Sequence, residues 1–234
     1  MTSARDLARS RSGAAVALLL LAPAPTIGVA AALGAGPDPL GQAVYLVAKA
    51  WIVIFPASWF LLVEKERASL SPARWEGLAI GAAVGLVSAV AIVGAWLLLG
   101  GRVDPAAVSA AVDRMGLRSI GAYVVAALGW SFVNSLVEEY VYRWFVYRCL
   151  LRLVAPGAAV VGSAAVFTAH HVVALSFYLE PVLVAVASAG VFVGGAVWSL
   201  LYRRYGSIWP GWVAHVLADL AIFGIGGWIV FGGG

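Results

Sequence analysis

Seven apolar stretches, separated by short polar segments, make up most of the chain. They cover residues 14–33, 43–63, 77–100, 119–137, 157–179, 181–202 and 207–231. Each has about the 20 residues that a transmembrane helix needs, and the two-residue alternation that would indicate barrel strands is absent from them. The pattern therefore predicts an all-α, polytopic transmembrane helix bundle of about seven spans, with residues 1–234 forming a single integral-membrane domain.

The segment between the third and fourth spans, residues 104–118, admits two interpretations. It begins with an Asp-Pro pair, and proline is common at the first position of a helix. Val108, Val112 and Met115 would then share one face of a short interfacial helix. A plain connecting loop is the alternative.

The first span also has features of a secretory signal peptide. Arg5, Arg9 and Arg11 precede its apolar run, and alanine-rich sequence follows. The apolar run, however, is longer than a normal signal core and about as long as a membrane span, so we expect the first helix to be retained. Pro23 and Pro25 predict that this helix is not straight.

Composition excludes several classes of protein. Hydrophobic residues make up 63% of the chain and charged residues 11%, with a mean hydropathy of +0.97, whereas a soluble domain carries about 25% charged residues. The chain is therefore neither a soluble globular protein nor a disordered one, and the single Cys149 cannot form an internal disulfide. The net charge of +4 lies mostly at loop positions, which argues against a nucleic-acid partner. The lipid bilayer is the expected surrounding.

The placement of lysine and arginine predicts the orientation and the host. With the N-terminus inside, eleven of these residues fall in inside segments and three, Arg102, Arg114 and Arg118, in outside segments, while Lys49 lies within the second span. This positive-inside bias predicts a cytoplasmic N-terminus and, after seven spans, an extracytoplasmic C-terminus. Arginine outnumbers lysine 13 to 2, which is typical of a GC-rich bacterium. We therefore expect a multi-pass protein of the bacterial cytoplasmic (inner) membrane.

Ionisable side chains are concentrated in three of the predicted spans. Eight of the 11 acidic residues lie in the N-terminal tail or in loops. The other acidic residues and all the histidines lie within the fifth and seventh spans or at the end of the fourth: Glu138, Glu139, His170, His171, His215 and Asp219. An acidic group at mid-depth costs at least about 2.5 kcal/mol and usually marks function. The structural alternative is that these groups are interhelical hydrogen-bond partners.

Helical spacing predicts which of these groups meet. His215 and Asp219 are four residues apart and share a helix face, and Glu139 and Arg143 have the same spacing, which favours a local ion pair. The adjacent Glu138 and Glu139 point about 100° apart, so they cannot face one site in the same way. The simplest assignment pairs Glu139 with Arg143 and leaves Glu138 for chemistry, with the reverse assignment still open.

The neighbouring His170 and His171 are subject to the same restriction. One of them is expected to enter the cluster while the other packs or hydrogen-bonds elsewhere, and spacing alone does not choose between them. A histidine in the cluster can hold a water molecule or stabilise an oxyanion.

The residue types limit how such a site can hydrolyse a peptide bond within a membrane. The H-E-x-x-H pattern of zinc proteases is absent, and a two-aspartate mechanism lacks a second aspartate beside Asp219. A serine–histidine pair using Ser131 is conceivable but leaves Glu138 and Asp219 without a role. What remains is a carboxylate that activates water with help from histidines, because a glutamate removed from water suits general-base catalysis near neutral pH. Two histidines and a carboxylate could also ligate a metal with an open position.

Three short motifs occur in these spans. Residues 138–143 have the form E-E-x-x-x-R, residues 167–171 F-x-x-x-H and residues 215–219 H-x-x-x-D/N, with Gly-Ser-Ile-Trp at 206–209 just before the last. In order, topology and approximate spacing, the set resembles the CPBP intramembrane endopeptidases, the family of the CAAX prenyl proteases and of bacteriocin-processing and self-immunity proteins. The resemblance covers about residues 119–224, within a motif-bearing core of about 119–231.

The resemblance implies roles for the first two motifs. Glu138 would activate the water and His171 would help to position it. Glu139 and Arg143 would support the site. His170 has no role that the resemblance carries over.

The resemblance also assigns the remaining motif residues. His215 and Asp219 would stabilise the oxyanion or ligate a metal, and Phe167 would be a packing residue. The CAAX prenyl proteases have asparagine at the position of Asp219, and an ionised aspartate cannot donate a hydrogen bond to an oxyanion. Asp219 would instead orient His215 and keep it protonated, assist a metal, or act as the neutral acid. A metal such as zinc, if used, would be held by Glu138, His171 and His215.

The sequence thus predicts an intramembrane peptidase that hydrolyses a peptide bond of a membrane-associated protein or of a leader or sorting peptide. The water would be activated by Glu138, with no cofactor or with a divalent metal. Glu138, His171 and His215 are expected to converge around one cavity reached from the cytoplasmic half of the membrane. The alternatives are a proton-coupled transporter that uses the same groups as a relay, and a catalytically silent immunity or scaffold protein.

Overall fold

The computed structural model describes residues 11–34, 38–65, 71–72 and 75–232, and every regular element within these residues is a helix. Seven helical spans in this part are long and apolar enough to cross a membrane. They are Arg11–Gly34, Pro39–Val63, Trp75–Arg102, Ile120–Leu151, Pro156–Ser176, Pro181–Tyr205 and Trp209–Phe231. The predicted all-α bundle is thereby confirmed, and the chain is a multi-pass membrane protein.

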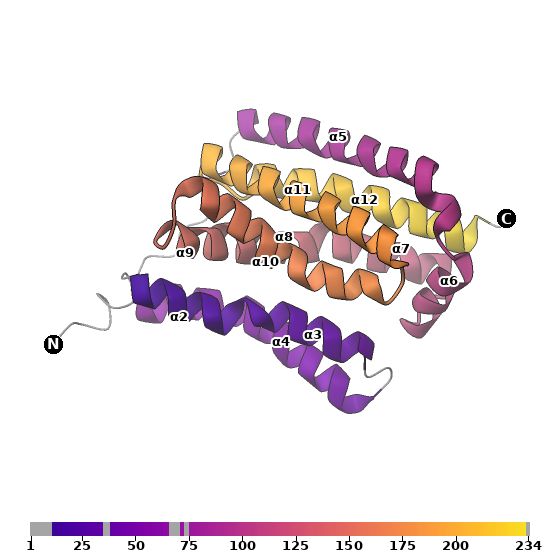
Figure 1. Ribbon diagram of the computed structural model, residues 1–234, viewed down its shortest axis with the longest axis horizontal. Coiled ribbons are helices and arrows are strands. Elements are labelled where there is room, and N and C mark those ends of the chain that lie inside the picture. Colours follow the sequence, from indigo (N-terminus) through magenta and orange to yellow (C-terminus); the bar gives the residue numbers. More distant parts are fainter. Residues whose placement is uncertain (1–10, 35–37, 66–70, 73–74, 233–234) are drawn as a thin grey trace.

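Several spans consist of more than one helical segment. In chain order the segments are α2 (Arg11–Leu21), α3 (Pro23–Gly34), α4 (Pro39–Ser58), η1 (Trp59–Val63), α5 (Trp75–Leu99), η2 (Gly100–Arg102), α6 (Pro105–Arg114), α7 (Ile120–Leu128), η3 (Gly129–Asn134), α8 (Ser135–Glu139), η4 (Tyr140–Tyr147), α9 (Arg148–Leu151), α10 (Pro156–Ser176), α11 (Pro181–Tyr205) and α12 (Trp209–Phe231). Figure 1 shows successive spans running in opposite directions, with α2, α3 and α4 along one side of the bundle and α5 along the other. The span from α7 to α9 lies between them, together with α10, α11 and α12.

The first span breaks at Pro23, as its prolines predicted, and it packs into the bundle. Ala14, Ala17 and Leu21 of α2 are fully buried in the same apolar cluster as Val146 of η4. The Arg11 guanidinium donates a hydrogen bond to the carbonyl oxygen of Leu153 at 2.7 Å. The first span therefore contributes to the core of the bundle, and its retention stays a prediction.

The segment after the third span contains a short helix, so the helical interpretation of residues 104–118 is correct. Asp104 precedes α6, and its side chain accepts a hydrogen bond from the backbone N–H of Ala106 at 2.9 Å. Pro105 occupies the first turn, where its missing N–H costs nothing. The location of α6 at a membrane surface stays a prediction.

The fourth span is much longer than the sequence indicated. Its predicted end was residue 137, but the helix continues to Leu151 through two wider, π-helical segments, η3 and η4. The predicted end was wrong because charged side chains lower the hydropathy after residue 137, whereas the Arg143 side chain is fully buried beside Glu139. The extension places Glu138 and Glu139 in the interior of a span instead of at its end.

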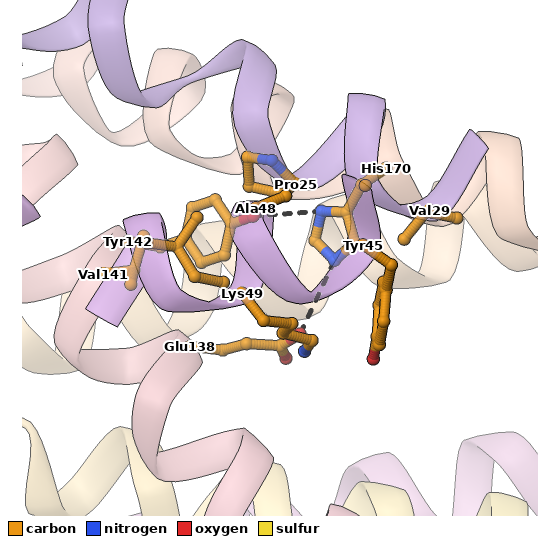
Figure 2. Close-up of a pocket in the computed structure, with 11 residues that line it drawn as sticks. Pro25, Val29, Tyr45, Ala48, Lys49, Glu138, Val141, Tyr142 and His170 are labelled. Carbon is orange, nitrogen blue, oxygen red and sulfur yellow. Dashed lines mark hydrogen bonds and ion pairs between the residues drawn. The ribbon is translucent and has the colours of Figure 1, made fainter. Parts of the chain in front are cut away.

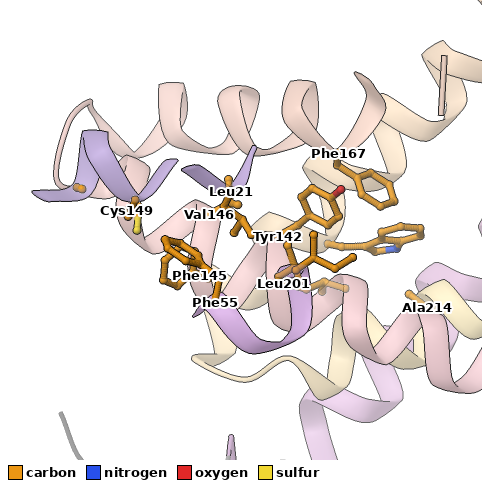
Figure 3. Close-up of a cluster of buried hydrophobic side chains, with 14 of the residues drawn as sticks. Leu21, Phe55, Tyr142, Phe145, Val146, Cys149, Phe167, Leu201 and Ala214 are labelled. Carbon is orange, nitrogen blue, oxygen red and sulfur yellow. The ribbon is translucent and has the colours of Figure 1, made fainter. Parts of the chain in front are cut away.

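The main apolar core lies along η4. Phe145 and Val146 of η4 pack there with Leu21 of α2 and Phe55 of α4, and Phe167 of α10 closes the core beside the ionisable groups (Figure 3). This packing holds the first, second, fourth and fifth spans together around the segment that carries the glutamates.

Candidate active site

The two glutamates lie on α8, a short α-helical stretch between two π-helical segments. π-Helical turns are rare and often mark functional sites. Within this stretch, the Ser135 hydroxyl donates to the carbonyl oxygen of Ser131. The Glu139 side chain is fully buried, and that of Glu138 is 12% exposed. The helix thus carries both carboxyl groups into the interior of the bundle.

His215 of α12 joins the two adjacent glutamates through its two ring nitrogens. Its Nδ1 lies 3.3 Å from Glu139 Oε1, and its Nε2 lies 3.5 Å from Glu138 Oε2. The 100° between neighbouring helical positions is therefore accommodated, because each glutamate approaches a different edge of one imidazole ring. The His215 ring stacks on Trp198 of α11 with centroids 4.1 Å apart, which fixes its plane.

Asp219 lies one helical turn beyond His215 on the same face of α12, as the spacing predicted. Its Oδ1 is 3.7 Å from His215 Nε2, which is an ion-pair distance but too long for a direct hydrogen bond. Carboxylate oxygens therefore surround both nitrogens of His215.

The predicted ion pair between Glu139 and Arg143 is present and completely buried. Arg143 Nη1 lies 3.1 Å from Glu139 Oε1, and Nη2 donates to the carbonyl oxygen of Gly195 at 3.1 Å. The guanidinium also lies 4.7 Å from the centre of the Phe167 ring and 5.2 Å from that of Trp198. Phe167 therefore packs against the Arg143 guanidinium, and the ion-pair partner of that guanidinium is Glu139.

Gly211 of α12 is required by the position of Glu139, and sequence reasoning missed it. A Cβ atom at residue 211 would lie well inside van der Waals contact with Glu139 Oε2. The close approach of α12 to α8 at this point allows His215, one turn later, to reach both glutamates. The only signal in the sequence was a glycine shortly after the Gly-Ser-Ile-Trp segment.

Both members of the His170–His171 pair reach the site, whereas the sequence analysis expected only one. His170 Nε2 lies 3.5 Å from Glu138 Oε1, and its Nδ1 forms a 3.0 Å hydrogen bond with the Tyr142 hydroxyl. The rings of Tyr142 and His170 also stack, with centroids 5.7 Å apart. Tyr142, which the sequence analysis did not single out, thus holds a histidine against the carboxyl group of Glu138.

His171 is held by its own helix. Its Nδ1 lies 3.0 Å from the carbonyl oxygen of Phe167, so Nδ1 carries the proton and Nε2 keeps a free lone pair. Ligand atoms of Glu138, His170 and His171 all lie within 4.8 Å of one another. This set fits a divalent metal, because each histidine has a second contact that fixes its ring. It differs from the set inferred from the resemblance by containing His170 in place of His215.

A cavity of about 40 Å³ adjoins Glu138, which is enough for a water molecule. It lies between the α3–α4 pair and the span that carries the glutamates (Figure 2). Its walls include Glu138, Tyr142 and His170 on one side and Tyr45 and Lys49 of α4 on the other. Lys49 has no role among the residues predicted from the sequence. Its signal was a lysine inside an otherwise apolar span.

The structure offers no support for a serine nucleophile. The Ser131 hydroxyl is buried and forms no hydrogen bond within the described part of the chain. A histidine within hydrogen-bond reach would be needed to take its proton.

Comparison with known proteins agrees with this site. Residues 120–221 match the family described as "Type II CAAX prenyl endopeptidase Rce1-like". The match covers the fourth to the sixth spans and the first half of the seventh, and it includes all three motifs, which confirms the resemblance found in the sequence. By its description, the matched family is one of CAAX prenyl endopeptidases. Neither the curated proteins nor the solved structures gave a match to the chain.

Proposed function

We propose that the protein is an intramembrane peptidase in which Glu138 activates a water molecule for attack on a peptide bond. The observation that carries this proposal is the position of Glu138. Its carboxyl group borders a water-sized cavity and has the Nε2 atoms of His170 and His215 at 3.5 Å. A carboxylate that faces water and is steadied by histidines has the geometry of a general base.

The residues around Glu138 have separate roles in this proposal. His170, oriented by Tyr142, would help to hold the water against Glu138. Glu139 and Arg143 form the buried support that fixes one edge of His215, so that His215 presents its other nitrogen to Glu138. Asp219 would keep His215 protonated. A proton would pass from water to Glu138 and then to the leaving amine.

The substrate would be a membrane-associated protein, or a leader or sorting peptide, in the bacterial cytoplasmic membrane. The site lies within the spans and is built from their side chains, so a substrate must be presented at the membrane. A proton-coupled carrier or a silent scaffold would use the same buried groups without breaking a bond.

The test separates hydrolysis from transport and scaffolding. The purified protein in detergent is incubated with membrane proteins of its host in ¹⁸O-labelled water, and new C-termini are sought by mass spectrometry. We expect labelled C-termini that are absent with heat-inactivated protein, because hydrolysis places a water oxygen in the new carboxylate. If no new C-termini appeared when the complete set of host membrane proteins was supplied, the result would contradict the proposal.

A bound metal at Glu138, His170 and His171 would polarise water and lower the energy needed to deprotonate it. With Glu138 as the base, activity should survive prolonged treatment with 1,10-phenanthroline. The control is a zinc endopeptidase in the same detergent, which should lose its activity. Loss of activity that added zinc restores would instead make Glu138 a ligand and contradict its role as the base.

A further inference from the structure

Helix α4 carries a lysine in an apolar span at the wall of the Glu138 cavity. Lys49 Nζ donates to Asn134 Oδ1 at 2.7 Å and lies 5.7 Å from the centre of the Tyr45 ring. This is the one hydrogen bond that the structure gives to the ammonium group within the described residues. Since an ammonium has three N–H groups, two are left for the cavity. Figure 2 shows the Lys49 side chain extending toward Glu138.

The position of Lys49 is fixed from two sides. Asn134 lies one turn before Glu138 on the same span, so the bond ties Lys49 to the helix that carries the carboxyl group. On the other side α3 packs tightly on α4, because a Cβ at Gly28 would lie 2.8 Å from that of Ala48. A neutral donor would join the two helices equally well, without the cost of a charge in the membrane. The charge therefore points to a function.

The cavity contains two kinds of donor on opposite walls, and His215 is not among its described lining residues. His170 faces Glu138 from α10, and Lys49 faces it from α4. A substrate carbonyl whose carbon met a water beside Glu138 would turn its oxygen toward one of these donors. Building on the peptidase function above, we propose that Lys49 is a catalytic residue that donates hydrogen bonds to the carbonyl oxygen of the scissile peptide bond.

The step balances without a change in Lys49. As the water oxygen bonds to the carbonyl carbon, Glu138 takes the water proton and the π electrons move onto the carbonyl oxygen beside the ammonium. When the C–N bond breaks, these electrons re-form the C=O bond and the amine leaves with the proton from Glu138. Because the negative charge on oxygen develops only during the reaction, the Lys49 hydrogen bonds strengthen in the transition state.

The proposal concerns a residue outside the family-matched segment, residues 120–221. The second span would thereby complete the site formed by the fourth, fifth and seventh. Tyr45 packs beside Lys49, so its ring would help to hold the ammonium toward the cavity.

The test compares Lys49→Met with Lys65→Met. These are the only two lysines of the chain, and Lys65 is exposed. The probes are a fluorogenic peptide carrying a site that the wild-type protein cleaves and the matching peptide aldehyde, whose hydrate mimics the tetrahedral intermediate. We expect Lys49→Met to lower kcat about 100- to 1000-fold and to weaken aldehyde binding by more than about tenfold. KM should change by less than about threefold, because a ground-state peptide uses the donors weakly.

Controls separate this role from a structural one. Lys65→Met should match wild type, and Lys49→Arg, which keeps charged donors, should recover part of kcat. If Lys49→Met weakened the binding of the aldehyde and of the peptide equally, the result would contradict the proposal. An unchanged kcat would also contradict it. Where Lys49→Met does not fold, Lys49→Gln replaces it, with the same losses expected. Wild-type cleavage that stops in Glu138→Gln but persists in Lys49→Met would overturn the Lys49 role alone. Cleavage that persists in Glu138→Gln would overturn the proposed function.

Discussion

At the scale of single residues, the site depends on which carboxyl group forms an ion pair with which basic side chain. Glu139 and Arg143 neutralise each other in full burial, and the guanidinium lies against the rings of Phe167 and Trp198. Glu138 is left with histidines and Lys49 around it. This division explains why two adjacent glutamates can have different roles. Glu139 holds Arg143 in the interior of the bundle, and Glu138 borders the water-sized cavity.

Replacing Glu139 should therefore cost stability as well as activity. Glu139→Gln leaves the Arg143 charge buried without a counter-ion, which is expected to cost about 3 to 5 kcal/mol. The measurement is thermal unfolding in detergent, followed by tryptophan fluorescence. Glu180→Gln is the matched control, because Glu180 pairs with Arg102 at an exposed position. This substitution should lower the free energy of unfolding by less than about 1 kcal/mol. Equal melting temperatures for the two variants would contradict the buried-pair account.

Tyr142 should contribute to activity through His170. Tyr142→Phe removes the hydroxyl that orients the His170 ring and should lower kcat/KM about fivefold, the equivalent of about 1 kcal/mol for one hydrogen bond. Tyr140→Phe is the control, because the Tyr140 hydroxyl bonds to the carbonyl oxygen of Val53 in an exposed position. If both variants kept full activity, the Tyr142 hydroxyl would have no part in orienting the water.

The two neighbouring histidines should both matter. The resemblance alone would make His170→Ala much milder than His171→Ala, but His170 is the one whose Nε2 lies 3.5 Å from Glu138. We therefore expect His170→Ala to lose at least as much kcat/KM as His171→Ala, measured on the same peptide at equal folded fraction. A His170→Ala protein with wild-type activity would restore the assignment made from the motif.

At the scale of helices, the contact between α12 and α8 positions His215. Gly211→Ala places a methyl group against Glu139 and should destabilise the protein by about 1 to 3 kcal/mol and lower its activity. Gly224→Ala on the same helix meets nothing within 4 Å and should be neutral in both respects. Unfolding in detergent and peptide cleavage give the two readouts. A neutral Gly211→Ala would mean that the two helices can move apart without harming the site.

The sequence predicted the helical bundle because apolar runs of about 20 residues have few other solutions in a membrane. It also predicted the Glu139–Arg143 pair and the shared face of His215 and Asp219, since both follow from a four-residue spacing. Contacts between helices could not be predicted in this way. The Tyr142–His170 bond and the Lys49–Asn134 bond join residues 28 and 85 positions apart, and spacing within one helix does not reach so far.

The fourth span shows where hydropathy misleads. Charged residues lower the hydropathy of residues 138–148, and this ended the predicted helix at residue 137. In the fold, Arg143 is neutralised and Arg148 lies 5.3 Å from the centre of the Phe60 ring. Burial against partners removes the cost that hydropathy assigns to these charges.

At the scale of the whole molecule, the orientation of the bundle is a separate prediction. Lysine and arginine placement puts Arg114 outside and Arg204 inside, and both side chains are exposed. In a Cys149→Ser background, Arg114→Cys should react with an impermeant maleimide in intact cells, and Arg204→Cys only after permeabilisation. The opposite labelling pattern would reverse the topology and place the N-terminus outside.

The whole bundle also determines how a substrate could enter. The family-matched spans supply the motif residues, whereas α3 and α4 close the cavity from the other side. Substrate choice would therefore depend strongly on the N-terminal third of the chain.

The role of Glu138 as the base that activates water is tested by the kcat/KM of Glu138→Gln on a mapped peptide. The substitution is nearly isosteric and leaves the Glu139–Arg143 pair intact, so the melting temperature should stay close to that of wild type. We predict a fall in kcat/KM of at least about 100-fold. A folded Glu138→Gln protein that cleaves within about threefold of the wild-type rate would contradict the account.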